Sequence, residues 1–161
     1  MTNPSPPDAI QVQLNIGAFE TEVRVGPAAA PTATLVLAIG AQQIADAFFR
    51  RMPPTPLQVE NAIQVVEDEV VRARTLVPAG TWICSADADM QAIAVLVGGR
   101  AVSDGLLSLE AVEHTFNRWV DWVEGRPSSQ DDLPHSAGFA ASLLVLREFM
   151  HHLQVPGLRL I

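Results

Sequence analysis

The sequence has a single cysteine, no lysine and no long hydrophobic run. Cys84 has no second cysteine to pair with, so an internal disulfide is excluded and a reducing, cytoplasmic setting is favoured. No apolar run reaches the roughly 18–20 residues that a membrane-spanning helix requires. The start of the chain also lacks the basic and then apolar pattern of a signal peptide. The sequence therefore predicts a cytoplasmic protein that has no membrane partner.

Positive charge is scarce. All 10 basic residues are arginine, against 18 aspartate and glutamate residues, which gives a formal net charge of -8 over 161 residues. An acidic protein repels phosphate backbones at long range, so the sequence predicts no nucleic-acid partner. The 48% hydrophobic and 17% charged content is ordinary for a globular chain and excludes a disordered or fibrous one.

Apolar residues that alternate with polar ones, and short apolar runs, predict strands in the first half of the chain. Apolar residues alternate on both sides of Gly17 and Ala18, which predicts a β-hairpin over residues 9–26. The continuous apolar run Thr34–Ile39 predicts a strand buried inside the sheet instead of one at its edge. A further short strand is predicted at Thr81–Cys84.

Helical periodicity predicts five helices, over about residues 44–52, 55–74, 90–97, 108–123 and 137–153. Thr55, Pro56 and Gln58 form a capping box at the start of the second, and Ser108 caps the fourth. The last helix is apolar on most sides, so we expect it to be central and buried. These elements predict one mixed α/β domain over residues 9–161, preceded by a disordered tail at residues 1–8.

Several loops, taken in order, resemble the exopolyphosphatase and guanosine pentaphosphatase family. The run Asn15–Val23 is similar to that family's Asp-Ile-Gly-Gly-Gly-Ser-Thr-Glu-Leu loop. The other matches are Leu37–Phe49 with its next strand and helix, Ser85–Ala94 with its Gly-Gly-Thr loop, Asp104–Leu109 with its His-Gly turn, and Ala137–Ala141 with the start of its penultimate long helix. Their order and spacing agree from about Ile10 to Ile161.

The resemblance implies an α/β, actin-like (ribonuclease-H-like) ATPase lobe with a mixed sheet and flanking helices. Members of that family have two such lobes, and the phosphoanhydride site lies in the cleft between them. This chain is similar to the second lobe alone. The first lobe supplies half of the cleft and the glutamate thought to activate water, and no position here matches that glutamate.

The first loop departs from the family pattern where phosphate would bind. Glycines let backbone N–H groups approach phosphate closely, but Ala18, Phe19 and Glu20 stand where the family has Gly, Gly and Ser. We expect Phe19 to fill the space of a phosphate and Glu20 to repel one. Asn15 replaces an aspartate, which weakens Mg²⁺ binding. The candidate remnants of a phosphate loop here are Asn15, Gly17, Glu20 and Thr21.

The second loop departs in the same direction. Asp87, Ala88 and Asp89 stand where the family has Gly-Gly-Thr, so two carboxylates replace two close backbone approaches. An Asp-x-Asp pair could hold a hard cation such as Mg²⁺ or Ca²⁺. Alternatively, Asp87 or Asp89 caps the following helix. Both aspartates are counted among the candidate phosphate-loop remnants.

Other polar residues give weaker signals. Glu110 and His114 lie one helical turn apart, but no third ligand is near them, which favours a surface pair. His151 and His152 lie at the end of the last helix, where they suit the helix dipole. Cys84 lies in an apolar strand, which predicts a buried, inert thiol.

The loops together predict no catalytic residue, no metal and no cofactor; Mg²⁺ would be needed only if hydrolysis survives. The predicted function is that of a non-catalytic, exopolyphosphatase-related binding or interaction module. The alternatives are a residual phosphoanhydride hydrolase of polyphosphate or guanosine pentaphosphate, completed by a dimer mate, and a sensor of a nucleotide or other metabolite. Because a single lobe leaves an apolar face without its sister, we expect a homodimer or a partner protein.

Overall fold

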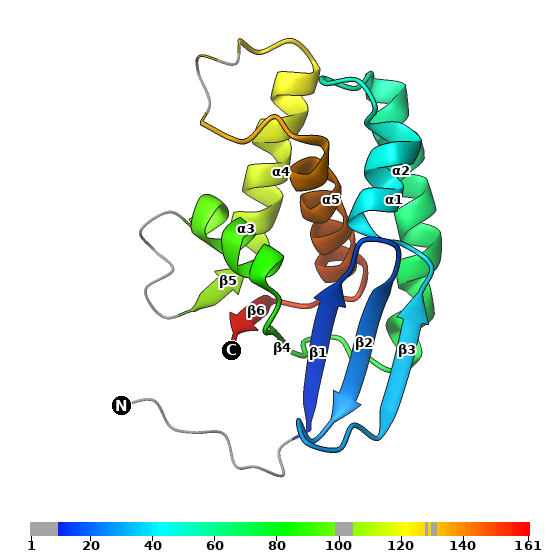
Figure 1. Cartoon of the computed structure of the whole chain (residues 1–161). Helices are drawn as coiled ribbons and strands as arrows, with labels where there is room; N and C mark the ends of the chain where they lie inside the picture. The colour runs from blue at the N-terminus through cyan, green and yellow to red at the C-terminus, as the bar shows by residue number, and fades with distance from the viewer. Residues whose placement is uncertain (1–9, 99–104, 128, 130–131) are drawn as a thin grey trace.

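The computed structural model describes residues 10–98, 105–127, 129 and 132–161 (Figure 1). The predicted tail at residues 1–8 lies outside these ranges. The strands are β1 (Gln11–Ile16), β2 (Thr21–Gly26), β3 (Ala33–Leu37), β4 (Ile83–Ser85), β5 (Leu106–Ser108) and β6 (Gly157–Leu160). The helices are α1 (Ala41–Phe48), α2 (Pro56–Val70, continued by the 3₁₀ turn Val71–Thr75), α3 (Ala88–Gly98), α4 (Leu109–Val123) and α5 (Ala137–His152).

The described strands form one mixed sheet in the order β3-β2-β1-β4-β6-β5. The neighbours β3, β2 and β1 are antiparallel, β1, β4 and β6 are parallel, and β5 is antiparallel to β6. Val12 lies beside Ile83, Ile83 beside Leu158, and Leu158 beside Leu107. All four of these side chains are buried in the core, which confirms the predicted α/β domain with a mixed sheet and flanking helices.

The run Thr34–Ile39 does not form a buried inner strand, so that prediction is wrong. Its strand, β3, lies at the edge of the sheet. Leu37 is buried, whereas Val36 on the opposite face is 43% exposed. The reason is that Leu37 packs in the core, whereas the opposite face of the sheet, which also carries the exposed residues Thr34 and Arg24, faces solvent.

Two short strands were not predicted. The residues of β5 were matched to a turn and those of β6 were assigned no element, because three or four residues are too few to show an alternating pattern. Ser108 ends β5 and also caps α4, since its hydroxyl accepts a hydrogen bond from the N–H of Ala111. The predicted cap is therefore confirmed.

The helices follow their predicted caps and faces. Thr55 and Gln58 form the predicted capping box, because each side chain accepts a hydrogen bond from the other residue's N–H. Helix α5 packs against α1, α2 and α4 at the centre of the molecule (Figure 1), as its sequence predicts. Trp119 is 1% exposed and lies against Phe49 and Phe116. No helix among the described residues has the length and apolar character needed to cross a bilayer.

Candidate functional site

A pocket of about 630 Å³ lies where the N-termini of α1, α3 and α5 meet the carboxyl end of β1. Polar side chains come from the first residues of these helices and from the end of β1. The remaining lining is mainly apolar. The lining residues are Asn15, Ile16, Gly17, Ala18, Ala41, Gln42, Asp87, Asp89, Ala92, Ile93, Leu96, Pro134, Ser136, Gly138, Phe139 and Ser142.

The hairpin turn between β1 and β2 is bonded to the start of α1. The carbonyl of Gly17 accepts from Ala41 N–H at 2.9 Å, and the carbonyl of Ala18 accepts from Gln43 N–H at 3.0 Å. A side chain at Gly40 would place its Cβ 2.4 Å from the backbone of Ala18, so only glycine fits there. The turn therefore uses N–H groups of α1 that could otherwise bind an anion.

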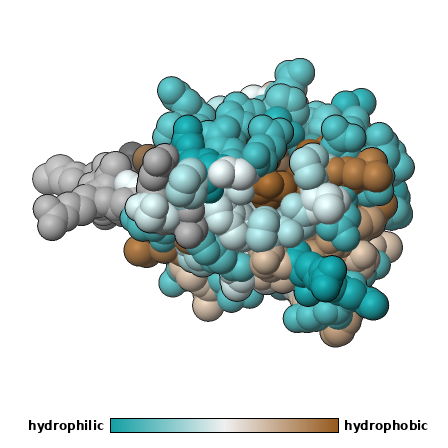
Figure 2. Space-filling view, turned by 90° about the horizontal axis from the view of Figure 1, so that it is seen from above, coloured by the Kyte–Doolittle hydropathy of each residue, from teal (hydrophilic) through white to brown (hydrophobic). Residues whose placement is uncertain are grey.

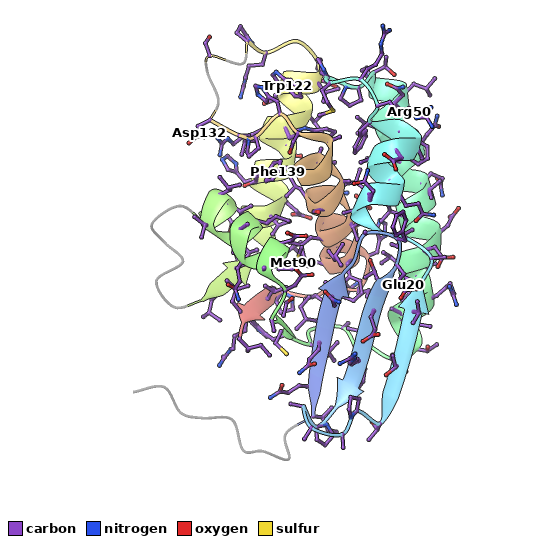
Figure 3. All side chains as sticks on the ribbon, in the orientation of Figure 1. Glu20, Arg50, Met90, Trp122, Asp132 and Phe139 are labelled. Carbon is purple, nitrogen blue, oxygen red and sulfur yellow. The ribbon has the colours of Figure 1, made fainter. Side chains whose placement is uncertain are left out.

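Three residues of the first loop do not line the pocket. Phe19 is 67% exposed and lies outside the lining, so it does not fill the space of a ligand, and that expectation is wrong. Glu20 also lies outside the lining, at the β2 end of the turn (Figure 3). Thr21 is buried, and its hydroxyl donates to the carbonyl of Ile39 at 2.8 Å. This hydrogen bond gives Thr21 a structural role.

The second loop supplies two carboxylates to the pocket. Asp87 Oδ1 accepts a hydrogen bond from Asp89 N–H at 2.9 Å, and the carbonyl of Asp87 accepts from Gln91 N–H at 3.0 Å. Asp87 is therefore the N-cap of α3, which confirms one of the two alternatives for this pair. Its carboxylate occupies a helix N-terminus, the position that favours a bound anion.

The apolar wall of the pocket, which α3 forms on one side and α5 on the other, comes from residues that the sequence did not indicate as a site. Leu96 on α3 and Phe139 on α5 both line it, although Phe139 was expected in the core. Ser136 caps α5 by accepting a hydrogen bond from Phe139 N–H at 3.2 Å, and Figure 3 shows Phe139 near that end of the helix. The only sequence signal for this wall is that α3 is nearly all apolar.

The residues considered as possible metal ligands do not come together in a site. Glu110 and His114 are both exposed. In the described ranges, no group of three or more His, Cys, Asp or Glu side chains is arranged to hold a metal ion. Cys84 is buried, and its Sγ lies 3.5 Å from the carbonyl of Val12. Burial raises the pKa of its thiol, as an inert cysteine requires.

A cluster of paired charges lies at the C-terminal end of α5, away from the pocket. Glu148 is fully buried and lies 2.5 Å from Arg147 Nη1 and 2.9 Å from His152 Nε2. His151 Nδ1 lies 2.6 Å from Glu113 Oε1. The sequence indicated the two histidines but neither of their acidic partners. This cluster holds α5 in place against α4 and α2, through His151 with Glu113 and His152 with Glu67.

Comparison with known proteins identifies the fold. No protein-family model matches the sequence, and no curated protein is significantly similar to it. Among solved structures, an Aquifex aeolicus Ppx/GppA phosphatase superposes with a TM-score of 0.73 at 15% identity, covering 96% of this chain and 53% of that one. An exopolyphosphatase from Cytophaga hutchinsonii gives 0.67 at 14% identity, covering 95% and 53%.

This chain has the fold of about half of a Ppx/GppA phosphatase. It spans only about half the length of the solved structures that it matches. The match confirms the predicted actin-like lobe and is consistent with a single lobe of the Ppx/GppA fold.

Proposed function

We propose that this chain is a binding module built on half of the Ppx/GppA fold, and that it does not hydrolyse phosphoanhydrides. The observation that carries this proposal is the carboxylate of Asp87, which caps α3 at the pocket. A phosphoryl group bound at this helix N-terminus would meet an anion already in place. Coulomb repulsion between the Asp87 carboxylate and a phosphoryl group beside it would oppose phosphate binding.

The remaining lining supports the same conclusion. Phosphoryl transfer needs cations or backbone N–H groups aimed at the phosphoryl oxygens, together with a positioned water. Among the described lining residues no side chain is cationic, and Asp89 adds a second carboxylate. The carbonyls of Gly17 and Ala18 already accept hydrogen bonds from the first turn of α1.

A phosphate-release assay tests this proposal directly. The purified chain is incubated with polyphosphate or guanosine pentaphosphate and Mg²⁺, beside the variants Glu20→Ala and Asp87→Asn. Asparagine caps helices as well as aspartate does, so Asp87→Asn removes the charge and keeps the cap. We expect phosphate release at the no-protein background for the unmodified chain.

Mg²⁺-dependent release above background by the unmodified chain would contradict the proposal. It would restore the residual hydrolase, and a change in rate with Glu20→Ala would then assign the activity to the hairpin turn. Sedimentation of the active sample would show whether a dimer completes the site.

A further inference from the structure

Helix α3 is apolar on nearly all sides although it lies at the surface. Apart from Asp89 and Gln91, its residues up to Val97 are all apolar. Met90 and Ile93 are buried, whereas Val95 is 65% and Leu96 41% exposed. A helix that is apolar all round is normally buried on every side. The outer face of α3 is therefore uncovered by the described part of this chain.

This outer face continues into the pocket. Ala92 and Leu96 on α3 line it from one side, and Pro134 and Phe139 line it from the other. Seen from above, the molecule shows a few brown residues set among hydrophilic ones (Figure 2). The volume of about 630 Å³ is in the range of sites that take a side chain or a small ligand.

The pocket is acidic where it is polar. Asp87 and Asp89 are among its lining residues, and Asp89 is exposed. No ion pair recorded for the described residues neutralises either carboxylate. The whole chain carries a net charge of -8, which adds to the attraction for a cationic partner.

We infer that the pocket binds a segment of a partner protein that places an apolar side chain between α3 and α5 and an arginine or lysine beside Asp87 and Asp89. This inference rests on the proposed function, because a hydrolytic site would bind the anionic phosphoryl group of its substrate beside Asp87 and Asp89, where we place a basic residue. The apolar anchor accounts for the exposed face of α3. The basic residue accounts for two carboxylates that form no ion pair among the described residues.

A second copy of the chain fits this surface less well. A two-fold dimer presents the same patch from both subunits. The aspartates of both subunits would then lie in one interface with no basic residue among the described lining, and like charges at an interface oppose association. A partner of opposite charge avoids this repulsion.

The test measures fluorescence anisotropy of a labelled peptide of alternating leucine and arginine titrated with the full chain. Peptides of leucine and glutamate, and of serine and arginine, are the ligand controls. The variants are Asp87→Asn/Asp89→Asn, which remove the rim charges and keep the cap, and Leu96→Ser on the apolar wall. The matched control, Glu60→Gln/Asp68→Asn, removes two exposed charges on α2.

We expect the leucine–arginine peptide to bind the unmodified chain. The aspartate variant should bind about tenfold more weakly, as the loss of two exposed charge pairs implies. Leu96→Ser should also bind more weakly than the unmodified chain. The α2 control should bind within about twofold of the unmodified chain. Equal affinity for the leucine–glutamate peptide, equal losses in the α2 control, or no binding would overturn the inference. So would a dimer in sedimentation that Leu96→Ser dissociates, since the occupant would then be a second copy. Phosphate release, measured on the same samples, reports separately on the proposed function.

Discussion

Acidic groups near the two ends of α5 are in opposite conditions. At the C-terminal end, Glu148 is buried and contacts Arg147 and His152. Near the N-terminal end, Asp87 and Asp89 at the start of α3 line the pocket. Asp87 accepts a backbone hydrogen bond, Asp89 is exposed, and no ion pair among the described residues includes either carboxylate. A buried carboxylate is tolerated only when it is paired, whereas an exposed one needs no partner. The paired carboxylate stabilises the fold, and we propose that the carboxylates at the pocket bind a partner.

The largest expected effect comes from removing the buried carboxylate. Glu148→Ala should lower the free energy of unfolding by about 3 kcal/mol, because Arg147 and His152 lose their shared partner in the interior. Urea denaturation measures this change. At the other end of α5, Asp89→Asn should change it by no more than about 0.5 kcal/mol. Similar losses in both variants would remove the distinction between the two ends.

The next effect concerns backbone fit at the pocket. Gly40→Ala should lower the free energy of unfolding by about 2 kcal/mol, because the new Cβ would lie 2.4 Å from the backbone of Ala18 and Phe19. Gly138→Ala is the matched control: nothing lies within 4 Å of its Cβ, and alanine favours a helix by up to about 1 kcal/mol. Thermal unfolding should therefore shift in opposite directions. A shift in the same direction would contradict the close approach at Gly40.

The smallest effect concerns Glu69, an acidic group that is paired without being deeply buried. Its carboxylate accepts from Ala38 N–H at 2.9 Å and lies 2.7 Å from Arg72 Nη1. The hydrogen bond from Ala38, with Arg72 adding to it, holds the pKa of Glu69 below its usual 4.5.

A lowered pKa in the folded state stabilises the fold above the unfolded-state pKa. This contribution is lost as the pH falls through the folded value. The stability difference between the unmodified chain and Glu69→Gln should therefore be greatest near neutral pH and should shrink below pH 4.5. Urea titrations at several pH values measure it. A difference independent of pH would show that Glu69 acts only through packing.

Local signals predicted much of the fold. Thr55 and Gln58 predict the start of α2, and the alternation of apolar and polar residues around Gly17 predicts the hairpin. Both predictions succeed because caps and turns depend on residues that are neighbours in the sequence. The edge position of β3 and the short strands β5 and β6 could not be predicted this way. They depend on pairing between segments far apart in the sequence.

The candidate site was predicted in the same uneven manner. Asn15 lies at the end of β1, and Asp87 follows the end of β4. These two strands are parallel neighbours, so their carboxyl ends lie at the same edge of the sheet and both residues line the pocket. Leu96 and Phe139 reach the pocket only through the packing of α3 and α5. Helical periodicity marks such residues as apolar without saying whether they face a core or an opening.

Strand β4 is only three residues long, yet it joins the two halves of the sheet. Ile83 pairs with Val12 on one side and with Leu158 on the other, and β5 pairs with β6 alone among the described strands. Pairings of such long sequence separation form slowly. During synthesis, therefore, β4 and β5 lack their neighbour β6 until residues 157–160 leave the ribosome. A chain that lacks β6 would leave the edges of β4 and β5 open, and open sheet edges are a usual starting point of aggregation.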